Sequence, residues 1–156
     1  MAWTAPSTWV AGLVTSTMLN TQIRDNFKAI GDPWQSYAPT FTSLTLGAST
    51  VTGNYMQAGK LVLARGSITL GTGFAITGTV QVSLPVTQNG PIVPLGQVGL
   101  RDVSAGAYRW WSAVANTANA TSFFVADPSD TRVNATTPWT WAVGDGITWQ
   151  LAYEAA

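Results

Sequence analysis

From residue 34 onward, the chain is a series of short apolar stretches separated by glycine- and proline-containing turns, and this pattern constrains the fold most. Lys60 to Leu70 has the composition of a long strand, and Thr79 to Leu84 alternates until Pro85 ends it. Other candidate strands cover residues 92–100, 107–115 and 121–126, and Val51, Tyr55 and Gln57 lie near Gly53 and Gly59 in the same β-type pattern. Roughly eight short strands with frequent turns predict a mainly β domain, a β-sandwich of jelly-roll type, over residues 33–156.

The C-terminal part of this pattern predicts a β-hairpin. Trp139, Trp141 and Val143 alternate with polar or small residues, and the turn sequence Gly144-Asp145-Gly146 follows. In the next stretch, alternate positions share one face, and they are all large and apolar: Ile147, Trp149, Leu151 and Tyr153. We therefore expect 139–143 and 147–153 to pair, with their aromatic side chains in contact.

A short α-helix is predicted before the β domain. Thr15 or Ser16 can cap its N-terminus, and Gly31 followed by Asp32-Pro33 ends it after about Ile30. Its apolar residues recur at spacings of three and four: Leu19, Ile23, Phe27 and Ile30. A helix of about 15 residues is marginal alone in water, so it needs a partner.

That partner is either the chain's own β domain, a helical bundle at a symmetry axis, or a larger particle. A coiled-coil seam is one form of the second alternative, with Asn26 as a single buried polar residue that fixes the register. Its spacing of 4–3–4 is given by Leu19, Ile23, Asn26 and Ile30.

Residues 1–14 lack a clear periodicity and are predicted to form an extended arm. With the helix, they make an N-terminal attachment segment, residues 1–32. Trp3 and Trp9 are candidates for anchors in pockets of another protein, because a few buried aromatic residues often provide most of an interface's energy. The alternative is that both tryptophans belong to the core of their own domain.

The low charge of the chain limits its partners. Only 9% of residues are charged, against about 25% in an average soluble domain, and seven basic residues balance seven acidic ones. No net field attracts the chain to nucleic acid or to an anionic membrane. With eight tryptophans and so few charges, part of the surface is expected to be buried against other protein chains.

Enzymatic and metal-binding functions are disfavoured by composition. The chain has no cysteine and no histidine, which removes the usual nucleophile–base pairs and the thiolate metal sites. The carboxylates lie mostly in predicted turns or at the termini, and Asp127-Pro-Ser-Asp130 is interpreted as a turn rather than a calcium loop. We therefore expect no catalytic residues, metal or cofactor.

The expected location follows from two further absences. The N-terminus lacks the basic start and apolar run of a signal peptide, and no stretch of about 20 apolar residues is present. The sequence thus predicts synthesis in the cytoplasm, without export or membrane insertion.

Two adjacent tryptophans suggest a contact surface. Trp110 and Trp111 lie in a predicted strand, so their side chains point to opposite faces and only one of them can fill the core. The other, with Arg109 and Arg101 nearby, is expected at a surface or intersubunit contact. Stacking on a sugar of a cell-envelope glycan is the alternative.

Several segments resemble one group of proteins when they are taken together. Pro6-Ser-Thr-Trp9-Val-Ala-Gly12 and Thr17-Met-Leu-Asn20-Thr-Gln-Ile-Arg-Asp25-Asn26 resemble the opening of structural proteins of phages and prophages of actinobacteria. Similarity to the C-terminal β domain of that group is found in Trp34-Gln-Ser-Tyr37-Ala-Pro39, Gly53-Asn-Tyr55-Met-Gln-Ala-Gly59-Lys60, Ser83-Leu-Pro85, Pro138-Trp-Thr-Trp-Ala-Val-Gly144-Asp145 and Tyr153-Glu-Ala-Ala156.

The resemblance implies a non-enzymatic virion component that is assembled in the host bacterium. Such proteins are minor tail or tail-fibre-like proteins, commonly homotrimers, attached to other virion proteins by the arm. The chain differs from longer relatives in lacking an extended shaft between helix and β domain, so a trimeric capsid decoration protein or head fibre is the alternative. A free carbohydrate-binding module is a less favoured class, and a glycan-degrading enzyme is a third.

Overall fold

The computed structural model describes residues 15–31, 34–90 and 94–156. Its N-terminal element is a continuous helix in three parts: α1 (Ser16–Leu19), a π-helical segment η1 (Asn20–Arg24) and α2 (Asp25–Gly31). Thr15 is the N-cap, and its hydroxyl accepts a hydrogen bond from the amide of Met18 at 3.2 Å. The predicted helix is thus confirmed, with Thr15 rather than Ser16 as its cap.

The described residues of the β domain form one antiparallel sheet of nine strands. In chain order they are β1 (Gln35–Ser36), β2 (Phe41–Thr45), β3 (Thr50–Ala58), β4 (Leu61–Thr69), β5 (Ala75–Ser83), β6 (Gly96–Asp102), β7 (Ala107–Ala115), β8 (Ser122–Ala126) and β9 (Gly146–Glu154). Their order in the sheet is β1-β3-β4-β9-β6-β7-β8-β5-β2.

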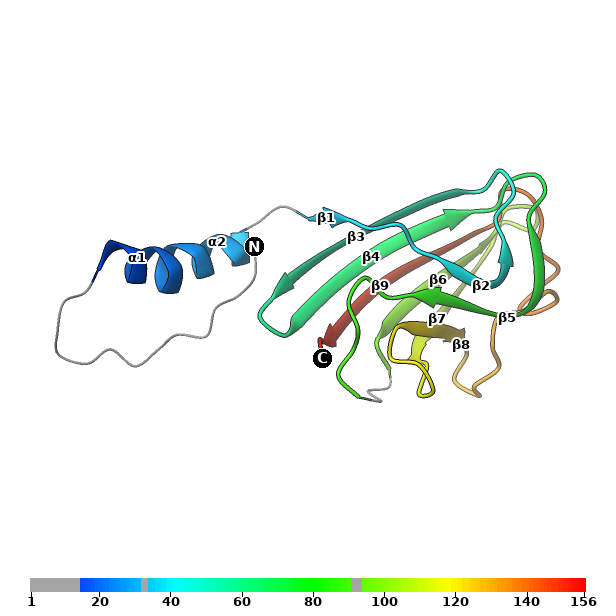
Figure 1. Cartoon of the computed structure of the whole chain (residues 1–156). Helices are drawn as coiled ribbons and strands as arrows, with labels where there is room; N and C mark the ends of the chain where they lie inside the picture. The colour runs from blue at the N-terminus through cyan, green and yellow to red at the C-terminus, as the bar shows by residue number, and fades with distance from the viewer. Residues whose placement is uncertain (1–14, 32–33, 91–93) are drawn as a thin grey trace.

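The sheet curls until its two halves face each other (Figure 1). β1 and β2 are its opposite edges, although only residues 37–40 separate them in sequence. Across the core, the ring of Phe41 on β2 lies 6.4 Å from that of Trp149 on β9. The predicted mainly β, sandwich-like domain preceded by one short helix is confirmed, and its two layers belong to a single sheet.

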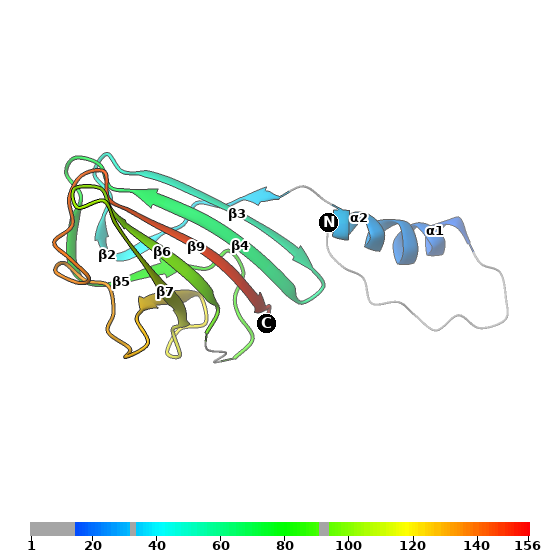
Figure 2. The ribbon, with the colours of Figure 1, turned by 180° about the vertical axis from the view of Figure 1, so that it is seen from behind.

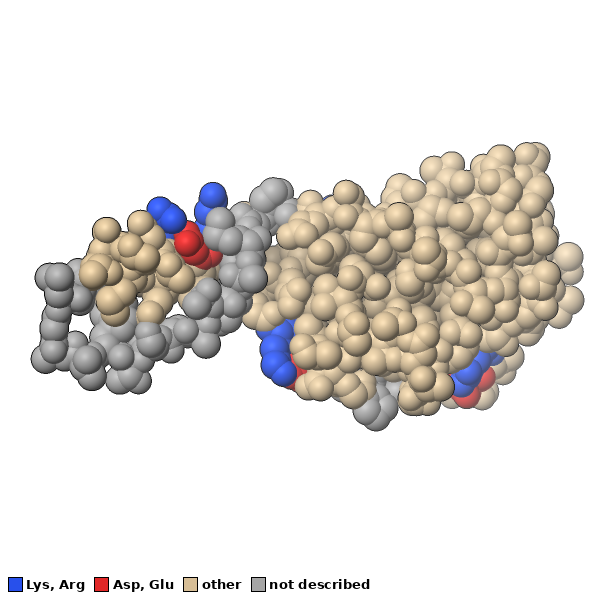
Figure 3. Space-filling view, in the orientation of Figure 1, with Lys and Arg blue, Asp and Glu red and all other residues tan. Residues whose placement is uncertain are grey.

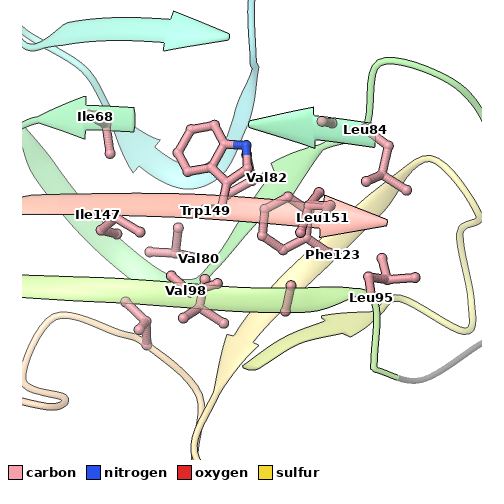
Figure 4. Packing of buried hydrophobic residues seen from close by; sticks show 14 of the residues in the cluster. Ile68, Val80, Val82, Leu84, Leu95, Val98, Phe123, Ile147, Trp149 and Leu151 are labelled. Atoms are coloured by element: carbon pink, nitrogen blue, oxygen red, sulfur yellow. The ribbon is translucent and has the colours of Figure 1, made fainter. Parts of the chain in front are cut away.

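Alternation along the strands places the core between the layers. On β9, Ile147, Trp149, Leu151 and Tyr153 are buried and the residues between them are exposed. Figure 4 shows Trp149 and Phe123 within the buried cluster, together with aliphatic residues from both halves of the sheet. A side chain at Gly66 would overlap the Trp149 ring, because its Cβ would lie 2.3 Å from that ring.

The predicted C-terminal hairpin is wrong: its second strand is present as β9, but its first strand is absent. Residues 139–143 form no strand, and β9 pairs with β4 on one edge and β6 on the other. Trp141 is buried and its indole N–H donates to the carbonyls of Asn134 and Thr137, whereas Val143 is exposed. Because both edges of β9 are occupied, Trp141 packs from a loop instead of from a neighbouring strand.

The turn before β9 was correctly placed and is held by a buried carboxylate. Asp145 Oδ1 accepts a hydrogen bond from the amide of Val103 at 2.9 Å, and Oδ2 accepts one from Ala142 at 2.8 Å. The side chain therefore ties the β6–β7 turn to the loop that precedes β9.

One buried tyrosine, Tyr153, and one half-buried tyrosine, Tyr37, predict loss of stability in alkali. Burial raises the pKa of the Tyr153 hydroxyl, which donates to the carbonyl of Val86 at 2.9 Å, and burial also raises the pKa of Tyr37. A tyrosine with a raised pKa in the folded protein contributes to stability as long as it stays protonated in both states. This contribution is fully present below the pKa of the unfolded chain, near 10, and is lost as pH rises above that pKa. We expect the free energy of unfolding, measured by urea titration, to fall above pH ~10, with Tyr153 contributing about 1.4 kcal/mol per pH unit and Tyr37 adding to the decline.

The matched control for this prediction is Tyr153→Phe, which keeps the ring and removes the ionisable group. It should be less stable at pH 7 by about 0.5–1.5 kcal/mol and show a shallower alkaline decline, from Tyr37 alone. An equal alkaline slope in the two proteins would contradict the assignment to Tyr153.

Candidate functional site

The helix carries an uncovered apolar surface. Leu19 and Ile23 are each 42% exposed and Phe27 is 73% exposed. We name these three residues the helix stripe. The helix lies outside the β domain, beyond the end where β1 begins (Figure 2), so the core of that domain does not cover the stripe.

The π-helical segment determines which residues make up the stripe. Each backbone bond in a π-helix spans five residues instead of four, so a turn contains more residues than in an α-helix. Leu19 and Ile23 are separated by such a turn, which brings residues four apart closer to the same line along the axis. The spacing of the stripe is therefore 4–4.

Asn26 is not part of the exposed stripe. Its side chain is already buried within one chain, and its amide donates to the carbonyl of Gln22 at 3.1 Å. The side chain of Ile30 lies outside the described part of the structure, as do Trp3 and Trp9. Of the predicted attachment residues, the structure thus groups Leu19, Ile23 and Phe27 on one surface and separates Asn26 from them.

The tryptophan pair is divided between the two faces of β7. Trp111 packs against the core, while Trp110 is 72% exposed on the outer face. Trp110 lies opposite Gly99 of β6, and a Cβ on Gly99 would be 3.0 Å from its ring. Arg109 is exposed but alternates with Trp110 along the strand and so points to the other side of the sheet. Trp110 is therefore the member of the predicted contact group that faces solvent on this surface.

Polar side chains from four strands lie in register beside Trp110. Strand pairing places Asn54 opposite Arg65, Arg65 opposite Gln150, and Gln150 opposite Gln97. The next row on the same face contains Thr52, Ser67, Thr148, Gly99 and Trp110. Together these two rows make a polar surface that extends across β3, β4, β9 and β6 and ends at the Trp110 ring on β7.

This surface is hollowed. The depression has a volume of about 660 Å³ and is lined by side chains of both rows. Within the described residues, the two-row surface includes one charged side chain, Arg65, whose guanidinium carbon lies 4.5 Å from the centroid of the Trp34 ring. We name this depression the outer hollow. Charged side chains are also sparse over the face of the molecule drawn in Figure 3.

Sequence reasoning missed most of the outer hollow. It selected Trp110 but none of the amides, because their alignment depends on pairings between segments up to about one hundred residues apart. The available signal was weak: polar residues occupy the exposed alternate positions of each strand, as they do on many solvated sheets.

The described residues contain no arrangement typical of a metal site: no three acidic residues come together within them. Asp127 accepts hydrogen bonds from the amides of Ser129 and Thr131, which makes residues 127–131 a turn. Among the helices that the structure describes, none has the length and apolar character needed to cross a membrane.

Comparison with known proteins gives no match to a family model, to a curated protein or to a solved structure.

Proposed function

We propose that this protein is a non-enzymatic structural component of a tailed-phage virion, a homotrimer that displays its β domain on the particle. The observation that carries the proposal is the helix stripe: three large apolar side chains exposed on a helix outside the β domain. An exposed apolar stripe on so short a helix is stabilised by burial against a partner. The partner proposed is the same stripe of two further copies.

The β domain has the properties of a displayed unit. Its core is closed by its own strands, so it does not need the helix to bury its apolar residues. In the proposed arrangement, the helix and the arm assemble the trimer and attach it to other virion proteins, and the β domain faces outward. This division of labour agrees with the sequence resemblance, which places the attachment sequence at the N-terminus.

Within the virion, we favour a tail-associated position, as a minor tail or receptor-binding component. The resemblance to minor tail proteins supports this position. The short connection between helix and β domain favours the alternative, a capsid decoration protein or head fibre. A free carbohydrate-binding module is a third candidate function. In that case the protein would be a soluble monomer that does not attach to the particle.

Gold-labelled antibody against the protein, viewed on intact phage particles by electron microscopy, tests the proposal. Label at the tail tip or baseplate is the expected result, and label spread over the head would select the capsid alternative. Particles that carry no label, whether intact or disrupted, would overturn both virion functions. Analytical ultracentrifugation of the purified chain is the companion measurement, with a trimer expected and a monomer contradicting the proposed assembly.

A further inference from the structure

We propose that the outer hollow is a binding site for a polysaccharide chain that is neutral or carries acidic groups. The site is formed by Asn54, Arg65, Gln97 and Gln150, with Trp110 at one end. This inference goes beyond the virion function and does not rest on it, because every residue that carries it belongs to the β domain of one chain.

The amides of the hollow are available for a ligand. Within the described residues, the side chains of Asn54, Gln97 and Gln150 make no hydrogen bond, and they lie side by side across the sheet with Arg65 between them. Each amide offers both a donor and an acceptor. A sugar hydroxyl likewise donates and accepts, so a row of amides matches a row of hydroxyls better than it matches an apolar or strongly charged partner.

Trp110 provides the apolar part of sugar recognition. Its ring is 72% exposed and packs beside Gly99, where the absence of a side chain leaves room for it. The C–H groups on one face of a sugar ring are attracted to the electron-rich face of an indole. The hollow thus combines one aromatic platform with several orienting polar groups, as small-ligand sites typically do.

The positive charge of Arg65 favours a ligand that is neutral or acidic over a cationic one. It forms no ion pair with a carboxylate among the described residues, and its contact with the Trp34 ring leaves its N–H donors for a ligand. Because no acidic side chain of the described residues lines the hollow, a cationic ligand has no partner among them. A uronic acid or a phosphate group on the polysaccharide would add a charge-assisted hydrogen bond to Arg65.

The size of the surface suits an extended chain. From β3 to β7 the rows cross four strand spacings, about 19 Å at ~4.8 Å each. A protein partner fits less well: the cores of subunit interfaces are mostly apolar, and burying three amides without partners is unfavourable. The surface is therefore assigned to a glycan rather than to a subunit contact.

Affinity gel electrophoresis of the full-length protein tests this assignment. The gels contain dextran, mannan, galactan, arabinogalactan, polygalacturonate or poly(glycerol phosphate), one in each gel. We expect at least one polysaccharide to retard the wild-type protein, with binding weakened at least tenfold by Trp110→Ala and about three- to tenfold by Gln150→Ala. Trp110→Phe, which keeps a ring, should retain part of the binding.

Gln57→Ala is the matched control for Gln150→Ala. Gln57 is exposed on β3 but alternates with Asn54 and so lies on the other side of that strand, outside the hollow. It should bind like the wild type. If the retarding polysaccharide is acidic, Arg65→Gln should reduce binding further than it does for a neutral one.

Retardation by none of the six polysaccharides would overturn the proposal, and so would retardation that Trp110→Ala leaves unchanged. Dissociation of the oligomer by Trp110→Ala, without loss of polysaccharide binding, would instead assign this surface to a subunit contact. Because these gels use the purified protein, a negative result leaves the particle-labelling experiment unaffected, and the reverse also holds.

Discussion

The Trp149→Ala variant should lose about 3–5 kcal/mol of unfolding free energy, the largest effect we expect from a single substitution in the β domain. Trp149 is only 2% exposed and contacts both layers of the sheet. Its ring lies 6.1 Å from Phe123 and 6.4 Å from Phe41, and its indole N–H donates to the Tyr37 hydroxyl at 3.1 Å. Alanine would leave a large cavity and an unpaired Tyr37 hydroxyl.

Urea denaturation followed by far-UV circular dichroism measures this loss. The matched control is Trp110→Ala, which removes the same side chain from the outer face of the same sheet. Because Trp110 is mostly exposed, its removal should change the unfolding free energy by no more than about 0.5 kcal/mol. Similar losses in the two variants would show that Trp149 is not the central core residue of this fold.

The features that depend on local periodicity were predictable from the sequence. The alternation on 147–153 correctly placed four buried residues on β9, and the adjacency of Trp110 and Trp111 correctly placed one on each face of β7. The helix cap at Thr15 is also a local signal. Each of these depends on neighbours within a few residues, for which side-chain direction follows from backbone geometry.

The features that depend on distant pairing were not predictable. Alternating aromatics indicated a strand at 139–143, but β4 and β6 take both edges of β9 and leave no edge for that segment. The amides of the outer hollow come from four strands whose register is set only by the folded sheet. The π-helical segment was missed for another reason: a coiled-coil spacing assumes a uniform α-helix, and one wider turn moves Asn26 away from Leu19 and Ile23.

These differences change the proposed assembly in one respect. A seam that contained Asn26 would bury an amide at the symmetry axis, and the register would depend on its pairing between chains. The helix stripe instead presents three apolar residues, and Asn26 is buried within its own chain. Assembly through the stripe therefore depends on apolar burial, so it is expected to be sensitive to a charge at its centre.

Ile23→Asp should therefore dissociate the proposed trimer, raising the dissociation constant at least a hundredfold, or about 2.8 kcal/mol. Ile23 is the middle residue of the stripe, so three copies of the substitution would bring three carboxylates together in an apolar contact. An unpaired charge buried in such a contact is strongly unfavourable. Sedimentation equilibrium over a range of protein concentrations measures the change.

The matched control is Thr17→Asp, which adds the same charge to an exposed residue of the first helical turn. Thr17 is two residues from Leu19 and thus lies on another side of the helix, where an acidic group near the N-terminus is mildly stabilising. It should remain trimeric. The unfolding of the β domain should be the same in both variants, because its core does not include the helix. If Ile23→Asp forms the same trimer as the wild type, the subunit contact lies on the β domain instead. The helix stripe would then serve for attachment to a different virion protein.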